Sequence, residues 1–219
     1  IQIVAANEIK EERAKFYSYL YPNTKMIVGD ITDNKISKEV TDYSKSKNVN
    51  CIIATPPCQG MSIAGNLNPL DKRNQLITYT IEIIKKIKPK FILLENVPLQ
   101  LTTKIKYKNK IIFIPDFIKA ELNTMYNFND KDLIKAMDYG IPQMRKRNIF
   151  LFVRKDMNFV WNFPKPAKKI INLRQALKNI PSLDPLLREG YNETVKMFPD
   201  YEKKKKAGLK ISKFHYPPT

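Results

Sequence analysis

The chain has 219 residues, enough for one sizeable hydrophobic core and the start of a second unit. Its 39 Lys and Arg residues exceed its 21 Asp and Glu residues by 18, which favours a polyanionic partner such as nucleic acid, although a biased genomic base composition would give the same balance. No apolar run approaches the roughly 20 residues that cross a bilayer, so we expect no membrane partner and a cytoplasmic, intracellular protein.

Apolar runs alternate with amphipathic stretches along most of the chain. Strands are predicted at residues 1–5, 26–28, 51–54, 91–94, 126–134 and 148–153. Helices are predicted at residues 10–20, 35–47, 74–87 and 117–125. This order is typical of an α/β protein with a mostly parallel sheet.

The composition changes after residue 162: seven prolines occur there, on both sides of one short helix predicted at 173–178. We therefore expect one domain over residues 1–161 and a linker with the start of a second domain over 162–219. Because the chain opens at Ile1 inside a strand-like run and stops in a loop-like segment, we also expect further sequence upstream and downstream.

Cys58 lies in a stiff turn, Thr-Pro-Pro-Cys-Gln-Gly at residues 55–60, directly after an apolar run. The two prolines fix φ and remove backbone donors, so the strand must end there, and Gly60 lets the chain leave without a steric conflict. A thiol held in this way can act as a nucleophile. The only other cysteine, Cys51, gives neither a zinc-ligand spacing nor a good disulfide geometry, so no metal is expected.

Glu95 follows the next apolar run, within Glu-Asn-Val-Pro at residues 95–98. Ligands gather at the carboxyl edge of a parallel sheet, so Cys58 and Glu95 could face one pocket. A carboxylate at this position could instead cap a helix.

The two turns together resemble the catalytic signatures of the DNA (cytosine-5)-methyltransferases. A third block, Gln-Met-Arg-Lys-Arg at residues 143–147, is similar to the Gln-x-Arg-x-Arg of that family, although a lone basic loop would look the same. The resemblance implies an α/β, Rossmann-like S-adenosylmethionine-dependent fold, in which a mostly parallel sheet contains one antiparallel strand, with part of a target-recognition domain after it.

The resemblance also implies a mechanism. The thiolate of Cys58 would add to carbon 6 of a cytosine, with Glu95 at ring nitrogen 3, so that carbon 5 can take a methyl group from S-adenosylmethionine. A free thiol with a pKa of about 8.5 is mostly protonated at neutral pH, so positive charge from Arg145 or Arg147 should help to ionise Cys58. Both arginines would also line the site for the target base and its phosphates.

Further contacts are implied position by position. The cofactor contacts would be Glu8, Ile9, Asp30, Ile31, Pro57 and Leu76. The DNA contacts would be Gln59, Ser62, Arg73, Arg145 and Arg147. The simpler alternatives are a surface carboxylate for Glu8 and a turn cap for Asp30. The glycine-bearing loop at residues 61–70, which contains Ser62, could be a lid that closes behind the target base or an ordinary surface loop.

Two parts of the family pattern are absent, namely the family's first strand with its Phe-x-Gly-x-Gly turn and the C-terminal segment that bears an asparagine. The remainder could therefore be a fragment, or one subunit of a split bacterial or phage modification enzyme whose missing parts come from a second polypeptide. Two further alternatives stay open: a catalytically silent DNA-binding subunit and an RNA cytosine-5 methyltransferase.

Overall fold

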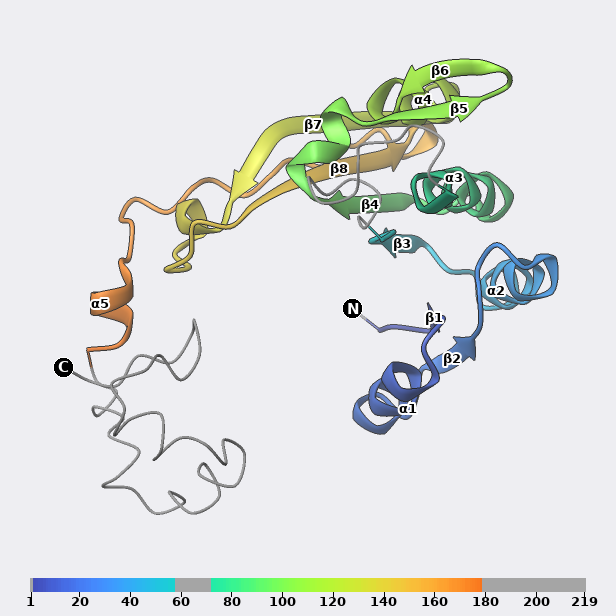
Figure 1. Ribbon diagram of the computed structural model, residues 1–219, viewed down its shortest axis with the longest axis horizontal. Helices are drawn as coiled ribbons and strands as arrows, with labels where there is room; N and C mark the ends of the chain where they lie inside the picture. The colour runs from blue at the N-terminus through green and yellow to red at the C-terminus, as the bar shows by residue number, and fades with distance from the viewer. Residues whose placement is uncertain (1, 58–71, 179–219) are drawn as a thin grey trace, which may run out of the picture. The chain divides into compact units, whose positions relative to one another are not determined.

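The computed structural model describes residues 2–57 and 72–178 (Figure 1). The chain divides into two compact units, Ile1–Ile170 and Ile171–Thr219. Among the described residues, no helix is both long and apolar enough to cross a membrane.

The first part of unit 1 is a β-α-β-α segment. Its elements are β1 (Ala5–Glu8), α1 (Glu11–Leu20), β2 (Lys25–Val28) and α2 (Asn34–Ser46). β1 and β2 pair in parallel, with Ala5 opposite Lys25. The strand predicted at residues 1–5 was therefore placed too early, because β2 begins at Lys25 and regular pairing with it begins only at Ala5.

The main sheet has four strands in the order β3-β4-β8-β7. They are β3 (Cys51–Ala54), β4 (Phe91–Asn96), β7 (Tyr126–Lys135) and β8 (Lys146–Arg154). β3 is parallel to β4, whereas β8 is antiparallel to both β4 and β7. The predicted arrangement of mostly parallel strands with one antiparallel strand is confirmed in this sheet.

Two helices pack on this sheet and form the core with it (Figure 1). They are α3 (Leu76–Ile87) and α4 (Ile114–Leu122). The fully buried side chains of the core are Ile77, Ile81, Ile84, Ile92, Leu94, Ile105, Ile114, Phe117, Ile118, Leu122, Tyr126, Phe150 and Phe152. α4 begins earlier than predicted because Pro115 fits the first turn of a helix, and it ends at Leu122.

A hairpin that was not predicted connects β4 to α4. It consists of β5 (Lys104–Tyr107) and β6 (Lys110–Phe113), which pair antiparallel with Tyr107 opposite Lys110. Its two turn residues, Lys108 and Asn109, have φ values of 45° and 62°. Positive φ at both central residues is typical of a type I′ turn, which Asn-Gly usually signals and Lys-Asn does not.

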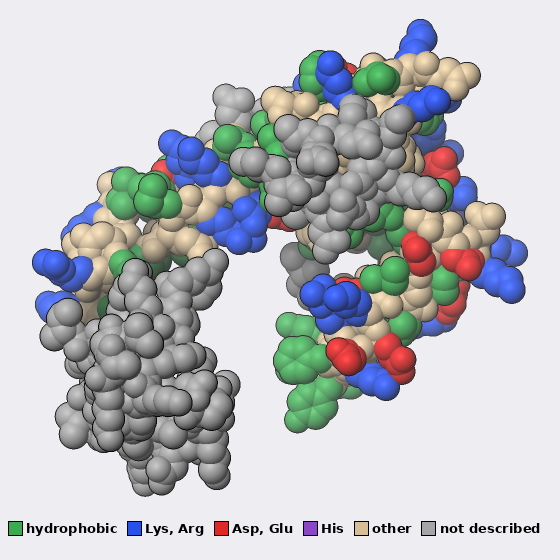
Figure 2. Space-filling view, in the orientation of Figure 1, with side chains coloured by type: hydrophobic (Ala, Val, Ile, Leu, Met, Phe, Trp, Pro, Cys, Tyr) green, Lys and Arg blue, Asp and Glu red, His purple; other side chains and the backbone are tan. Residues whose placement is uncertain are grey.

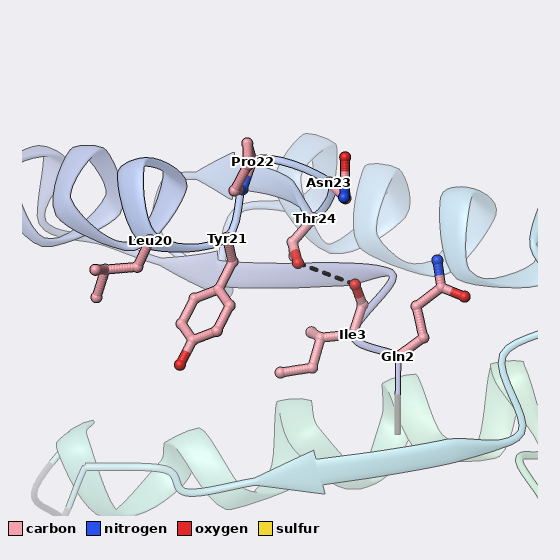
Figure 3. A pocket seen from close by; sticks show the side chains of 7 residues that line it. All are labelled: Gln2, Ile3, Leu20, Tyr21, Pro22, Asn23 and Thr24. Atoms are coloured by element: carbon pink, nitrogen blue, oxygen red, sulfur yellow. Dashed lines mark hydrogen bonds between the residues drawn. The ribbon is translucent and has the colours of Figure 1, made fainter.

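The end of α1 exposes apolar side chains. Phe16, Tyr19 and Leu20 are 65%, 82% and 50% exposed, and only Ala14 of this helix is buried. Figure 3 shows Ile3, Leu20 and Tyr21 pointing to the same side of a hollow of about 270 Å³ beside β1. Within the part of the chain that the structure describes, this face of the segment lacks the cover that apolar side chains normally receive.

In unit 2 the described residues contain α5 (Leu173–Ala176). Asn172 and Gln175 form a reciprocal capping box at its start, with Gln175 N donating to Asn172 Oδ1 over 2.9 Å. A helix was predicted at this place.

Candidate active site

The turn after β3 and the end of β4 lie at the same edge of the main sheet. The two strands are parallel and their pairing ends where Ala54 meets Leu94, so Thr55-Pro56-Pro57 and Glu95-Asn96 follow side by side. Asn96 Nδ2 donates a hydrogen bond of 2.9 Å to Pro56 O, and Asn96 Oδ1 accepts one of 2.8 Å from Val97 N. The buried amide of Asn96 therefore ties the proline turn to the strand that carries Glu95.

Glu95 forms an ion pair with Arg147. Arg147 Nε lies 2.8 Å from Glu95 Oε1, and the two side chains are 24% and 29% exposed. Because β8 runs antiparallel to β4, with Glu95 opposite Ile149, the start of β8 lies beside the end of β4. The ion pair engages Oε1 of the carboxylate, so Oε2 is the oxygen that could form a hydrogen bond with a ligand.

A second polar contact holds the start of β8. Asn148 Nδ2 donates a hydrogen bond of 2.9 Å to Gln100 Oε1, and the side chains are 1% and 2% exposed. Gln100 belongs to the short 3-10 helix Pro98–Thr102, directly after Val97. This buried bond fixes Asn148, and with it the neighbouring Arg147, against the segment that follows Glu95.

Arg145, the other arginine predicted at the catalytic site, is placed differently from Arg147. Arg145 is exposed, just before β8 begins, and its carbonyl oxygen accepts a hydrogen bond of 2.8 Å from Ala136 N. The structure thus brings Arg147 to Glu95 and leaves the Arg145 side chain at the surface.

The candidate cofactor residues Glu8 and Asp30 lie at the carboxyl ends of β1 and β2. Gly29 N donates to Glu8 O over 3.0 Å, so the two strand ends adjoin. Glu8 Oε1 accepts a hydrogen bond of 2.9 Å from Lys10 N, and Asp30 Oδ1 accepts one of 2.8 Å from Thr32 N. Glu8 ends β1 rather than following it, which corrects the predicted strand boundary.

Gly29 is required between β2 and Asp30. Its φ is +144°, and a Cβ atom there would lie 2.7 Å from Ile36 Cδ1. A side chain would be strained by this backbone and would push Ile36 away, so glycine keeps Asp30 close to the strand end.

The other predicted contacts differ in their exposure and position. Ile9 is 61% exposed, Ile31 is half-buried in the loop after β2, and Leu76 is the half-buried first residue of α3. Pro57 is exposed, and the backbone of Arg73 lies in the 3-10 helix Lys72–Gln75. Cys58, Gln59 and Ser62 lie outside the described residues.

Cys51, the other cysteine, begins β3 and so lies at the opposite end of that strand from the proline turn. Burial raises the pKa of its thiol above the ordinary value of 9.0. A raised pKa keeps this thiol protonated and poorly nucleophilic. Among the described residues, no group of three or more His, Cys, Asp or Glu side chains could hold a metal ion.

Sequence reasoning missed the roles of Asn96, Gln100 and Asn148. One signal was available: Asn148 is a polar residue at the head of an apolar run, and a polar side chain buried in a sheet needs a hydrogen-bonding partner. Nothing in the sequence indicates that the partner is Gln100.

Comparison with known proteins identifies the family. Residues 1–217 match the C-5 cytosine-specific DNA methylases. The chain belongs to this family. It is 40% identical over 189 residues to the Type II methyltransferase M1.HgaI of Avibacterium volantium, covering 84% of this chain and 52% of that protein. It is 33% identical over 178 residues to the Type II methyltransferase M.DdeI of Desulfomicrobium norvegicum, covering 77% and 40%.

Two solved methyltransferase structures have a similar fold. A crystal structure described as a DNA modification methyltransferase encoded within an E. coli prophage matches with a TM-score of 0.63 and 25% identity, covering 82% of this chain and 49% of that one. The Entamoeba histolytica methyltransferase EhMeth matches with a TM-score of 0.53 and 21% identity, over 76% and 49%. The predicted Rossmann-like fold is confirmed. The chain spans about half the length of the curated relatives it matches.

Proposed function

We propose that this chain provides the catalytic edge of a DNA cytosine-5 methyltransferase. The observation that carries the proposal is that the turn after β3, the end of β4 and the start of β8 contact one another at one edge of the sheet. Asn96 binds the turn that leads to Cys58, and Arg147 binds Glu95. Family membership, the Type II relatives and the charge of +18 support duplex DNA as the substrate. A role in restriction-modification follows from the same relatives.

In the proposed reaction the thiolate of Cys58 adds to carbon 6 of a cytosine turned out of the duplex, which forms the S–C bond. A proton held between Glu95 and ring nitrogen 3 neutralises the electron pair displaced into the ring, so carbon 5 becomes nucleophilic. Once carbon 5 carries the methyl group, its proton passes to solvent and the S–C bond breaks. The products are 5-methylcytosine, the free thiolate and S-adenosylhomocysteine, which is the cofactor after it has lost its methyl group.

The residues at the ends of β1 and β2 fit S-adenosylmethionine. Two carboxylates, Glu8 and Asp30, stand at adjoining strand ends, where they can accept hydrogen bonds from ribose hydroxyls and an adenine amino group. When bound, S-adenosylmethionine supplies the electrophilic methyl group. Ile9, Ile31, Pro57 and Leu76 are proposed as the apolar contacts of the same molecule.

We infer that the active protein contains more than this chain. Among the described residues β1 pairs only with β2, and β3 pairs only with β4, so each has an unpaired edge. Parallel strands are normally covered on both faces, yet Ile53 of β3 is 59% exposed and Val28 of β2 is 44% exposed. A further segment, from the same or from a second polypeptide, would complete these sheets and supply the glycine-rich turn.

The test is transfer of a labelled methyl group by the full-length gene product to duplex DNA and, separately, to RNA of the same sequence. The proposal predicts 5-methylcytosine in DNA and none when Cys58→Ser is used. Incorporation into RNA alone would establish the RNA alternative. DNA binding with no incorporation, even after the completing segment is supplied, would establish the silent-subunit alternative.

A further inference from the structure

The β5–β6 hairpin presents a basic face that neither Cys58 nor Glu95 uses. Its ten residues contain four lysines, Lys104, Lys106, Lys108 and Lys110, and no acidic residue. Lys104 and Lys106 are exposed, and no described carboxylate forms an ion pair with either of them. Figure 2 shows Lys and Arg side chains along this hairpin, with hydrophobic side chains between them.

The register of the hairpin sorts its side chains into two faces. Lys104 pairs with Phe113 and Lys106 pairs with Ile111, so these four side chains share one face. Phe113 and Ile111 are 39% and 62% exposed, which marks this face as the outer one. The opposite face carries Ile105, which is fully buried.

The apolar partners support the lysine side chains from across the hairpin. Lys104 Nζ lies 4.8 Å from the centroid of the Phe113 ring, within the range of a cation–π interaction. Ile111 stands opposite Lys106 in the same way and can cover the methylene stem of that lysine. The two lysines thus stand on the outer face two residues apart, so their Cα atoms are separated by about 6.8 Å along the strand.

The hairpin is firmly attached to the domain. Tyr107 OH donates a hydrogen bond of 2.9 Å to Glu121 Oε1 on α4, and Lys85 Nζ on α3 lies 2.6 Å from Glu121 Oε2. Tyr107 also packs against Phe117, with ring centroids 4.7 Å apart. A rigid support lowers the entropic cost of holding charges in a row for a ligand.

The base of the hairpin continues from the candidate active site. The 3-10 helix Pro98–Thr102 follows β4 after Val97, and Ile114 N donates to Thr103 O over 3.0 Å at the point where the hairpin strands close. Lys104 and Phe113 therefore stand at the end of the hairpin that adjoins this helix, and Lys106 lies farther along.

We propose that the outer face of the β5–β6 hairpin binds the phosphate backbone of duplex DNA beside the target base. Lys104 and Lys106 make the contacts, since two lysines about 6.8 Å apart along one strand match every second charge of one DNA backbone, whose successive charges lie about 3.4 Å apart on the axis. This inference rests on the proposed function and adds to it a second site of DNA contact, outside the catalytic edge.

The experiment measures the affinity of the full-length gene product for a fluorescent DNA duplex over a series of salt concentrations. The test variant is Lys104→Gln with Lys106→Gln, and the matched control is Lys38→Gln with Lys45→Gln on exposed positions of α2. Each phosphate contact contributes roughly 0.9 to the slope of log affinity against log salt. The test variant should lose about 1.8 of that slope and bind at least roughly tenfold more weakly near 0.1 M salt, whereas the control should keep the wild-type slope.

Equal slopes for the test and control variants would overturn the hairpin contact and leave the catalytic proposal standing if the wild-type protein still methylates DNA. Wild-type protein that neither binds nor methylates duplex DNA would overturn both. A test variant that keeps its DNA affinity but loses binding to anionic phospholipid vesicles would also overturn the inference.

A second measurement needs no variant. In the wild-type protein bound to the duplex, Lys104 and Lys106 should be protected from acetylation, while Lys38 and Lys45 react as in the free protein. Unchanged reactivity of Lys104 and Lys106 would contradict the proposal.

Discussion

Arg147 Nε lies 2.8 Å from Glu95 Oε1, and this ion pair joins the end of β4 to the start of β8. In the proposed reaction the Glu95 carboxyl group must share a proton with ring nitrogen 3, and it must approach that atom from a fixed direction. The arginine occupies one oxygen and so decides which way the other one points. An orienting arginine on a strand of a packed sheet holds the carboxylate more rigidly than an arginine on a loop would.

Arg147→Gln should lower kcat for methyl transfer by about 10²-fold, the usual effect of removing one oriented polar group from an active site. Arg147→Lys should restore only part of the rate, because an ammonium lacks the planar fork of a guanidinium. The control is Arg154→Gln on the same strand, where the guanidinium pairs with Asp156. Equal rates for the Arg147→Gln and Arg154→Gln variants would contradict a role for the ion pair.

The buried pair Gln100 and Asn148 should behave as a unit. Asn148→Leu alone leaves Gln100 Oε1 buried without its donor, which should cost about 1–3 kcal/mol of the free energy of unfolding. Adding Gln100→Met removes the orphaned oxygen and should recover much of that loss. Urea unfolding of the two single variants and the double variant gives the coupling energy directly, and strict additivity would show that the amides do not depend on each other.

Asn96→Ala should release the proline turn from β4, because the hydrogen bond to Pro56 O is lost. Small displacements of a reacting group cost up to about 10²-fold in rate, so we expect kcat to fall more than roughly tenfold. Asn127→Ala, at an exposed position of β7, is the matched control. An unchanged kcat in the Asn96→Ala variant would show that the turn holds Cys58 without this bond.

Glu121 should make the stability of the protein depend on pH. Its hydrogen bond from Lys85 is the main cause that lowers the pKa of its carboxyl group below the ordinary value of 4.5. A lowered pKa adds stability that is complete above the unfolded-state value and is lost as the pH falls through the folded-state value. Glu121→Gln should therefore cost about 1–2 kcal/mol at pH 7 and much less at pH 3, as measured by urea unfolding.

The comparison for that prediction is Glu39→Gln. Glu39 pairs with Lys25 at the surface, where an ion pair contributes less than about 1 kcal/mol. A loss on Glu121→Gln that stayed the same at pH 3 and pH 7 would show that packing, rather than charge, explains the contribution of Glu121.

Much of the fold could be predicted from the sequence because alternating apolar and amphipathic runs encode a parallel α/β sheet. The β5–β6 hairpin was not predicted, because its turn consists of Lys108 and Asn109 and contains neither glycine nor proline. β1 was placed too early because strand boundaries depend on the partner: pairing begins where Lys25 meets Ala5.

For the candidate site, the sequence indicated that Cys58 and Glu95 follow strands of one parallel sheet, and the structure adds that these strands, β3 and β4, are paired neighbours. The ion pair of Glu95 with Arg147 could not be derived in this way, because it depends on β8 inserting antiparallel between β4 and β7. The two arginines of the basic block looked equivalent in the sequence. Only the structure separates the half-buried Arg147 from the exposed Arg145.

The central claim is that Cys58 forms a covalent bond to the target cytosine, and DNA containing 5-fluorocytosine tests it most directly. Fluorine at carbon 5 cannot leave as a proton does, so the adduct should persist after methyl transfer by the full-length gene product. We predict a stable protein–DNA adduct whose cross-linked peptide contains Cys58, with none formed by Cys58→Ser and an undiminished yield for Cys51→Ser. Methyl transfer to normal DNA without any trapped adduct, or an adduct at Cys51, would contradict the account.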